Sequence, residues 1–289
     1  PIRIIAAQAP GASNDATART YADYFSSKLG VACTVENKPG GVGMIASELV
    51  ARSAPDGYTL LVILHSQLAQ APVLLKKVPI DTSKDLIPIA ALSTGTGLGV
   101  VKKDLPVNSM KELVEYAKTR PVSVGNYGVA SGWQLMMMQV ARQTGARFDI
   151  VNYKGTGPML TDLLAGQIDV GGGSLVGLTP GLQRGAIRPV VITYGGRSKK
   201  LPNVPTWADE GFIGPAFQNL AECNLLLAPA GTPGEVTARL AALAAESATQ
   251  SPRMKTLIDN LGLEEGPVVG EELRRFIDRV WPAFRSLTR

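Results

Sequence analysis

The sequence has few of the residues that build metal and cofactor sites. It contains two cysteines and one histidine in 289 residues, and these three lie far apart along the chain. A structural zinc or haem site needs such ligands gathered together, so we expect no metal and no cofactor. Cys33 and Cys223 each lie in a strand-like segment, and we expect two free, buried thiols.

Long apolar runs and aromatic residues are also scarce. The longest uncharged stretch that resembles a membrane span, residues 57–70, is shorter than the roughly 20 residues that a helix needs to cross a bilayer. Aromatic residues make up 6% of the chain and the basic residues are scattered, so we expect neither membrane insertion nor a nucleic-acid surface. The chain opens directly on a strand-like segment, and we expect any secretion signal to have been removed before it.

Charge is modest and unevenly placed. The chain carries 29 basic and 24 acidic residues, a net charge of +5, and a mean hydropathy of +0.10, which is typical of a folded globular protein. Residues 101–221 hold 13 basic and 8 acidic residues and therefore account for the whole excess. Most of these side chains fit solvated helix faces, but their summed field favours an anionic ligand.

Short apolar runs alternate with helical patterns along the whole chain. Capped helix starts are expected at Ser13 or Asn14, at Ser109 with Glu112 in a capping box, and at Thr232. The alternation restarts near residue 102 and predicts an α/β protein made of two parallel α/β units. The predicted strands are residues 2–7, 31–35, 58–64, 87–92, 97–101, 122–125, 149–151, 168–170, 190–193 and 225–228.

The motifs that would indicate an enzyme fail on their context. Gly41-x-Gly43-x-x-Ala46 matches a dinucleotide fingerprint, but four residues separate it from the preceding strand and no acidic residue ends the next one. Neither Ser131 nor Ser174 has the glycine spacing of a nucleophile elbow. We therefore nominate no catalytic residue and do not expect an enzyme.

Four segments rich in small residues stand at predicted helix starts: residues 11–15, 65–67, 128–132 and 153–157. Helix starts present free backbone N–H groups that attract anions, and small residues let a ligand approach the backbone. Ligands of α/β sheets bind where strands end and helices begin. Four such segments without a catalytic set indicate a binding protein.

Several stretches carry a family resemblance, in order along nearly the whole chain. They are Pro10-Gly11-Ala12-Ser13-Asn14-Asp15, Val35-Glu36-Asn37-Lys38-Pro39-Gly40-Gly41, Pro55-Asp56-Gly57-Tyr58-Thr59, Tyr153-Lys154-Gly155, Gly166-Gln167-Ile168-Asp169 and Ala228-Pro229-Ala230-Gly231-Thr232-Pro233. Together they closely resemble the substrate-binding proteins of tripartite tricarboxylate transporters, the Bug family of periplasmic receptors.

The resemblance implies a two-domain periplasmic-binding-protein fold of type II, the Venus-flytrap arrangement. Residues 1–100 and 222–289 would form one domain and residues 101–221 the other. It also implies a periplasmic, monomeric receptor that holds a small carboxylate between its domains and delivers it to membrane transporter subunits. The carboxylate would be a dicarboxylate, a tricarboxylate or an aromatic acid. An enzyme acting on a small acid and a sensing receptor for a two-component system are the alternatives.

We expect one ligand carboxylate to lie between the loops at residues 11–15 and 128–132. Asp15 is expected to cap its own helix rather than face an anion. Some family members have an acidic residue at the position of Gly173, and its absence here disfavours an amino-acid ligand. The nominated residues all follow predicted strands or open predicted helices: Gln8, Gly11, Ala12, Ser13, Asn14, Asp15, His65, Ser66, Gln67, Gly128, Ala130, Ser131, Gly132, Thr156, Gly173, Ser174 and Asn224.

Overall fold

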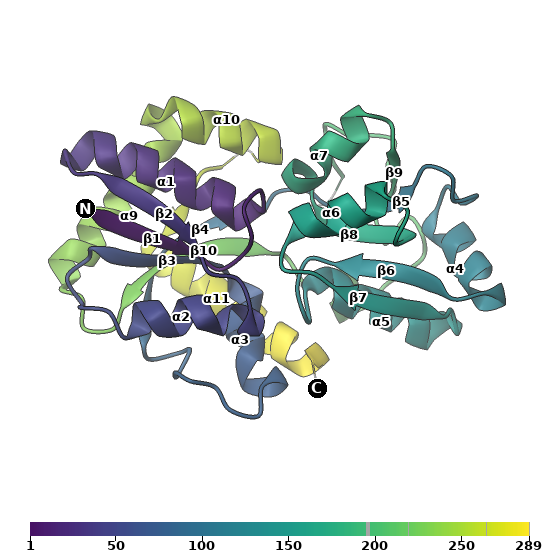
Figure 1. Cartoon of the computed structure of the whole chain (residues 1–289), viewed down its shortest axis with the longest axis horizontal. Coiled ribbons are helices and arrows are strands. Elements are labelled where there is room, and N and C mark those ends of the chain that lie inside the picture. The colour runs from purple at the N-terminus through teal and green to yellow at the C-terminus, as the bar shows by residue number, and fades with distance from the viewer. Residues whose placement is uncertain (195–196, 219, 264, 289) are drawn as a thin grey trace. The chain divides into compact units, whose positions relative to one another are not determined.

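A computed structural model describes residues 1–194, 197–218, 220–263 and 265–288 (Figure 1). These residues divide into two compact units, one made of Pro1–Thr94 with the chain from Glu222 onward, the other of Gly95–Ala221. The first crossing thus lies at Thr94 rather than near residue 100. The reason is that strand β5 (Gly97–Lys102) pairs on both sides with strands of the second unit.

The first unit contains a six-stranded sheet in the order β11-β4-β10-β3-β1-β2. The strands β1, β2 and β3 are parallel to one another, whereas β10 runs antiparallel to both of its neighbours, β3 and β4. The apolar runs of β1, β3 and β10 are almost entirely buried and that of β4 is largely buried, whereas the run of β2, at the edge of the sheet, stays partly exposed. The bounds are β1 Ile2–Ala6, β2 Cys33–Asn37, β3 Thr59–Leu64, β4 Leu86–Ser93, β10 Cys223–Pro229 and β11 Val268–Val269.

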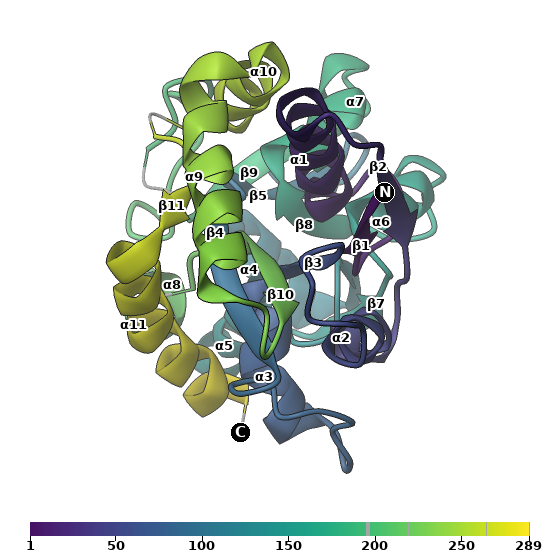
Figure 2. The same ribbon diagram turned by 90° about the vertical axis from the view of Figure 1, so that its left-hand side faces the viewer.

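Helices cover both faces of this sheet, with α1, α9 and α10 on one face and α2, α3 and α11 on the other (Figures 1 and 2). The stripe Ala18, Tyr21, Ala22 and Phe25 is buried against the sheet, as its helical spacing predicts. The helix bounds are α1 Ser13–Leu29, α2 Met44–Ala51 after the short 3₁₀ turn η1 (Gly41–Gly43), α3 His65–Leu74, α9 Gly234–Gln250, α10 Pro252–Leu261 and α11 Gly270–Thr288.

The second unit contains a five-stranded sheet in the order β7-β6-β8-β5-β9. In this unit α6 and α7 pack together over β8, and α5 packs against β7. The bounds are β6 Val122–Asn126, β7 Phe148–Asn152, β8 Val170–Ser174, β9 Ile187–Tyr194, α4 Met110–Thr119, α5 Gly132–Thr144, α6 Thr156–Leu164, α7 Leu175–Gln183 and α8 Pro215–Gln218.

The prediction of parallel sheets was wrong in one respect, because each sheet contains an antiparallel strand beside its three parallel strands, and the first sheet has a second one, β11, which runs antiparallel to β4. In the first sheet this strand is β10, and in the second it is β5, which runs antiparallel to β8 and β9. Each is the first strand after the chain crosses into its unit, so no crossover helix sets its direction. Both sheets therefore share an order of five strands, β2-β1-β3-β10-β4 in the first and β7-β6-β8-β5-β9 in the second, and the first sheet adds β11 beyond β4.

Two predicted helix starts differ from the structure, and one is confirmed. The Ser109 hydroxyl accepts from the Glu112 N–H at 3.1 Å, as the capping box predicts. Thr232 does not cap α9, which begins one residue after Pro233, and its hydroxyl donates to the Pro229 carbonyl instead. Thr232 thus belongs to the turn that precedes α9. The start of α1 is described with the site below.

Strand β8 was predicted at residues 168–170 but runs through the glycines at 171–173. Glycine carries no hydrophobic signal, so the period-two pattern stops before the strand does. A Cβ at Gly171 would lie 3.0 Å from the Met159 sulfur, and one at Gly173 would lie 2.9 Å from Thr156. A Cβ at Gly172 would instead collide with the Trp133 indole. The glycines thus let α6 approach one face of β8 and α5 the other.

Replacing Gly172 with alanine should strongly destabilise the second unit. The added methyl group collides with Trp133, which is buried, stacks on Trp207 and donates to the Gly125 carbonyl, so we expect a loss near the upper end of the ~1–3 kcal/mol that overpacking costs. Urea unfolding followed by fluorescence measures it. Gly128→Ala is the control, since a Cβ there meets nothing within 4 Å. Equal stability of the two variants would contradict the packing argument.

Candidate ligand-binding site

Ten nominated residues come together at one edge of the first sheet. The strands β1 and β3 are parallel neighbours and end side by side, with Ala6 paired to Val62. After β3 the chain enters α3 directly, and after β1 it enters α1 through a short loop. In β10, Asn224 pairs with Leu64, the last residue of β3. The residues gathered here are Gln8, Gly11, Ala12, Ser13, Asn14, Asp15, His65, Ser66, Gln67 and Asn224.

The helices α1 and α3 both begin at this edge without a side-chain cap. The N-cap of α1 is Ala12, with extended backbone angles of φ −75° and ψ 165°, and the N-cap of α3 is Leu64. Ser13 and Asn14 were predicted to cap α1, but both lie inside its first turn. The first N–H groups of a helix have no carbonyl partner within it, so two uncapped starts leave backbone donors and partial positive charge at one edge.

Buried polar atoms without partners lie among these backbone donors. Five neutral side chains have an amide or hydroxyl atom that finds no hydrogen-bond partner among the described residues, and each side chain is at most 9% exposed. Such atoms are costly to bury unless a ligand or water satisfies them. The atoms are Gln8 Nε2, Asn14 Nδ2 and Oδ1, Ser66 Oγ, Gln67 Oε1 and Asn224 Oδ1.

The carboxylate of Asp15 is engaged by three groups of its own unit. It accepts hydrogen bonds from the Gly11 N–H at 3.1 Å, from Asn37 Nδ2 at 3.0 Å and from Arg19 Nε at 3.2 Å. Burial by itself would raise the pKa of Asp15, but these hydrogen bonds and the Arg19 charge hold that pKa below its ordinary value. Asp15 is therefore charged, and it ties the loop before α1 to the rest of the unit.

Asn37 is a residue of this network that the sequence did not nominate. Its Nδ2 group donates to the Gln8 carbonyl at 2.9 Å as well as to Asp15, so the last residue of β2 holds both ends of the β1–α1 loop. The sequence did offer a signal for nominating Asn37, because it is an asparagine near the end of a predicted strand and lies in the stretch 35–41 that resembles the family. Its role depends on a contact across the sheet, which no local pattern reveals.

His65 is placed inside the first unit. Its side chain is fully buried, and its Nε2 lies 3.8 Å from Glu222 Oε2, within ion-pair distance. The ring packs edge-on against Phe276 and Phe284 of α11, at centroid distances of 5.4 and 5.0 Å. The imidazole thus anchors the start of α3 to α11 and to the residue at which the chain re-enters this unit.

In the second unit, the nominated serines cap their own helices. Ser131 Oγ accepts from the Gln134 N–H at 3.3 Å, and the Gln134 side chain accepts from the Ala130 N–H at 2.7 Å. Ser174 Oγ accepts from the Gly177 N–H at 3.4 Å, which caps α7. These starts are better satisfied than those of α1 and α3, so the backbone donors of the first unit are the stronger candidates for holding an anion.

The remaining nominated residues of the second unit shape the loops after its strands. Thr156 opens α6, which has no side-chain cap, and its methyl and hydroxyl groups pack against Gly173. Gly128 and Gly132 flank Ala130, whose φ of 54° is unusual for a residue with a side chain. Asn126, which the sequence did not nominate, ends β6 with an Oδ1 that finds no partner among the described residues. A polar residue at a strand end was its only signal.

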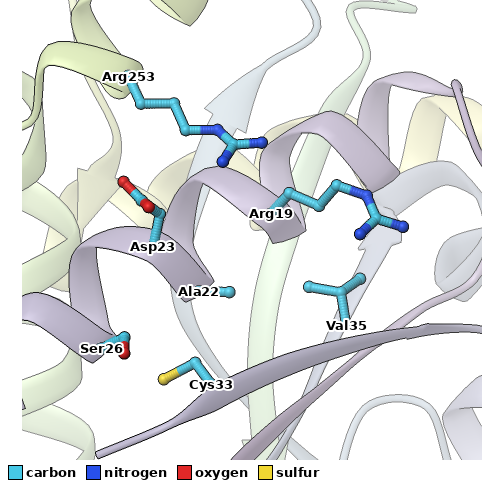
Figure 3. Close-up of a pocket in the computed structure, with 7 residues that line it drawn as sticks. All are labelled: Arg19, Ala22, Asp23, Ser26, Cys33, Val35 and Arg253. Atoms are coloured by element: carbon cyan, nitrogen blue, oxygen red, sulfur yellow. The ribbon is translucent and has the colours of Figure 1, made fainter.

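A cavity of about 290 Å³ lies elsewhere on the first unit, between α1 and β2. Figure 3 shows Arg19, Ala22, Asp23 and Ser26 of α1 on one side, Cys33 and Val35 of β2 on another, and Arg253 of α10 above them. None of the nominated residues lines it. It touches the site through Arg19, whose guanidinium pairs with Asp15.

No three His, Cys, Asp or Glu side chains of the described residues gather in a way that suits a metal ion. None of the helices in these described ranges is both long and apolar enough for a bilayer span.

Comparison with known proteins decides the family. Residues 17–281 match the family model described as the tripartite tricarboxylate transporter family receptor. The chain belongs to this receptor family. The resemblance noted in the sequence is therefore confirmed, and the receptor has the two-domain α/β fold of type II periplasmic binding proteins.

One curated relative and two solved structures are similar to most of the chain. The protein BugT of Bordetella pertussis is 32% identical over 235 residues, which covers 80% of this chain and 71% of BugT. The structure of Rpa4515 from Rhodopseudomonas palustris with adipate superposes with a TM-score of 0.90 at 27% identity, covering 99% of this chain and 96% of that one. The structure of MatC from Rhodopseudomonas palustris with bound malate superposes with a TM-score of 0.85 at 26% sequence identity, covering 100% of this chain and 98% of MatC.

Proposed function

We propose that this receptor captures a small carboxylate in the periplasm and delivers it, as a monomer, to the membrane subunits of a tripartite tricarboxylate transporter. The observation that carries the proposal is the pair of uncapped helix starts at neighbouring strand ends, surrounded by buried, unpartnered polar atoms. Rpa4515 and MatC, whose structures hold adipate and malate, support the choice of an acid.

The energies of these groups suit reversible capture. A helix start contributes about 0.3–1 kcal/mol toward an anion, and up to about 2 kcal/mol when partly buried. Each charge-assisted hydrogen bond adds about 1.5–3 kcal/mol. A few such bonds, less the ordering of ligand and loop, reach the roughly −8 kcal/mol of micromolar binding. The anion would be held by backbone and neutral side chains rather than by an arginine.

We infer a binding role without catalysis. Histidine, the usual general base, occurs once, and His65 is anchored between Glu222 and α11. The serines nominated in the second unit are engaged in capping their own helices. A carboxylate bound at this edge of the first unit would thus contact neutral amides and hydroxyls, which can hold it by hydrogen bonds but do not catalyse a reaction.

Calorimetry with succinate, adipate, malate, citrate and benzoate tests the proposal. We expect at least one of these acids to bind with 1:1 stoichiometry at micromolar or tighter affinity. Ser66→Asp should abolish that binding, because it places a competing carboxylate in the first turn of α3, while its effect on helix stability is favourable. Ser66→Ala is the matched control and keeps the backbone donors. Binding of sugars or cations with no response to acids would refute the proposal.

A further inference from the structure

Asn224 lies at the edge that carries the uncapped helix starts, and its backbone belongs to β10. It pairs with Leu64, the residue that caps α3, and its side chain reaches Thr17 in the first turns of α1. The side chain is completely buried. Asn224 is thus in contact with the elements that form both helix starts.

The hydrogen bonds around Thr17 determine which way the Asn224 amide points. The Thr17 hydroxyl donates its single proton to the Ser13 carbonyl at 2.8 Å. It can then only accept from Asn224, so the group 3.0 Å away must be the amide nitrogen Nδ2. The Asn224 carbonyl oxygen is consequently directed elsewhere, and it finds no hydrogen-bond partner among the described residues.

Asn224 Oδ1, like Asn14 Oδ1 and Gln67 Oε1, is a buried acceptor without a donor among the described residues. The helix starts offer donors, which suit the oxygens of a carboxylate. A carboxylate has no proton to give to Asn224 Oδ1, and two facing oxygens repel each other. The site as a whole is therefore satisfied by a ligand that presents an acid group and, beside it, a hydrogen-bond donor.

An alcohol fits this donor position better than an ammonium group. Two buried carboxylates of this unit lie near Asn224 or the α1 start, and both are engaged within the protein: Asp15 by Arg19, Asn37 and the Gly11 N–H, and Glu222 by His65. An ammonium group would thus be desolvated here without a matching charge from either carboxylate. A hydroxyl group donates to Asn224 and carries no charge to neutralise.

We propose that Asn224 makes this receptor selective for hydroxylated carboxylates, through a hydrogen bond from a ligand hydroxyl group to Asn224 Oδ1. The inference rests on the proposed function and narrows its ligand class. A buried polar group selects strongly against analogues that leave it unpaired. Asn224 therefore acts as a specificity-determining residue.

The test compares acids that differ by one hydroxyl group: malate with succinate, and citrate with tricarballylate. For the unmodified receptor, calorimetry should show at least one hydroxy acid binding tenfold or more tightly than its deoxy partner. Asn224→Leu should bring that ratio close to one, because leucine has a similar size and no acceptor. Thr17→Val is a second variant that serves if Asn224→Leu does not fold. It removes the acceptor that orients the Asn224 amide, so the amide can rotate, and it should also lower the ratio of hydroxy-acid to deoxy-acid affinity.

Tyr21→Phe is the control variant. It removes another buried hydroxyl group without a partner among the described residues, one turn further along α1, and should leave the ratio unchanged. Equal affinities within both pairs for the unmodified receptor would overturn the role of Asn224 while leaving carboxylate capture intact. A ratio that survives both Asn224→Leu and Thr17→Val would also overturn it. Failure of every acid to bind would refute the proposed function and this inference together.

Discussion

Replacing Asp15 with asparagine should weaken carboxylate binding by about ten- to a hundredfold, although the Asp15 carboxylate is engaged by groups of its own unit. The groups bonded to Asp15, at Gly11, Asn37 and Arg19, are all donors. An asparagine amide has the same shape but must point its own N–H donors at one of them. Leaving one such donor unpaired costs about 1–3 kcal/mol, and the loop before α1 would shift to avoid it. Calorimetry with the acid that binds best measures the loss.

The Asp15→Asn substitution should also change how the free energy of unfolding depends on pH. The pKa of Asp15 is lowered in the folded protein, so its contribution is fully present above its unfolded pKa of about 3.9 and is lost as the pH falls through the lower, folded value. Asp15→Asn should remove that part of the acid dependence, which urea unfolding between pH 5 and about 2.5 would detect.

Asp23→Asn is the matched control for Asp15→Asn. Asp23 lies two turns further along the same helix, is exposed, and lines the cavity beside α1 rather than the ligand edge. It should leave affinity unchanged. If the Asp15→Asn variant bound acids as tightly as the Asp23→Asn variant does, the conformation of the loop before α1 would not depend on the hydrogen bonds of the Asp15 carboxylate.

Removing the Glu222 side chain should lower the free energy of unfolding by about 1–3 kcal/mol, the usual cost of leaving a buried polar partner unsatisfied. Glu222 Oε2 and His65 Nε2 lie 3.8 Å apart at positions that are almost fully buried. The Glu222 carbonyl, which accepts from the Thr94 N–H and hydroxyl, is retained in Glu222→Ala, so the backbone at the crossing keeps its bonds. Denaturant unfolding of the intact chain measures the loss.

Two further variants separate the pair from general packing. Combining His65→Phe with Glu222→Leu replaces the pair by apolar groups against Phe276 and Phe284, and should recover most of the stability lost in Glu222→Ala. Glu271→Ala removes an exposed carboxylate that pairs with Arg275, and should change stability little. A double variant as unstable as Glu222→Ala would show that the pair is not the source of the effect.

The sequence allowed the α/β class, most strands and the helix starts at one edge of the first sheet to be predicted, because each depends on a local pattern; that this edge binds the ligand stays a prediction. Apolar runs mark the strands, and small residues mark the helix starts that follow them. The pattern failed at β8, where three glycines carry no hydrophobic signal although they are what lets Trp133 and Thr156 pack against opposite faces.

The remaining differences depend on contacts between distant residues. The antiparallel direction of β5 and β10 follows from where the chain crosses between units, which periodicity does not encode. Asp15 was expected to cap its helix, but its role is decided by Asn37, which comes from another strand. The orientation of the Asn224 amide likewise depends on Thr17, more than 200 residues earlier in the chain.

The position of β10 has a consequence for biosynthesis. This strand lies between β3 and β4 in the first sheet, yet it is made after the whole of the second unit. During synthesis, the second unit can complete its own sheet from one continuous stretch of chain. The strands β3 and β4 of the first unit meanwhile keep the edges that β10 will pair with unpaired. Such edges invite pairing with other chains. The nascent receptor is therefore most exposed to aggregation in the interval before residues 223–229 arrive.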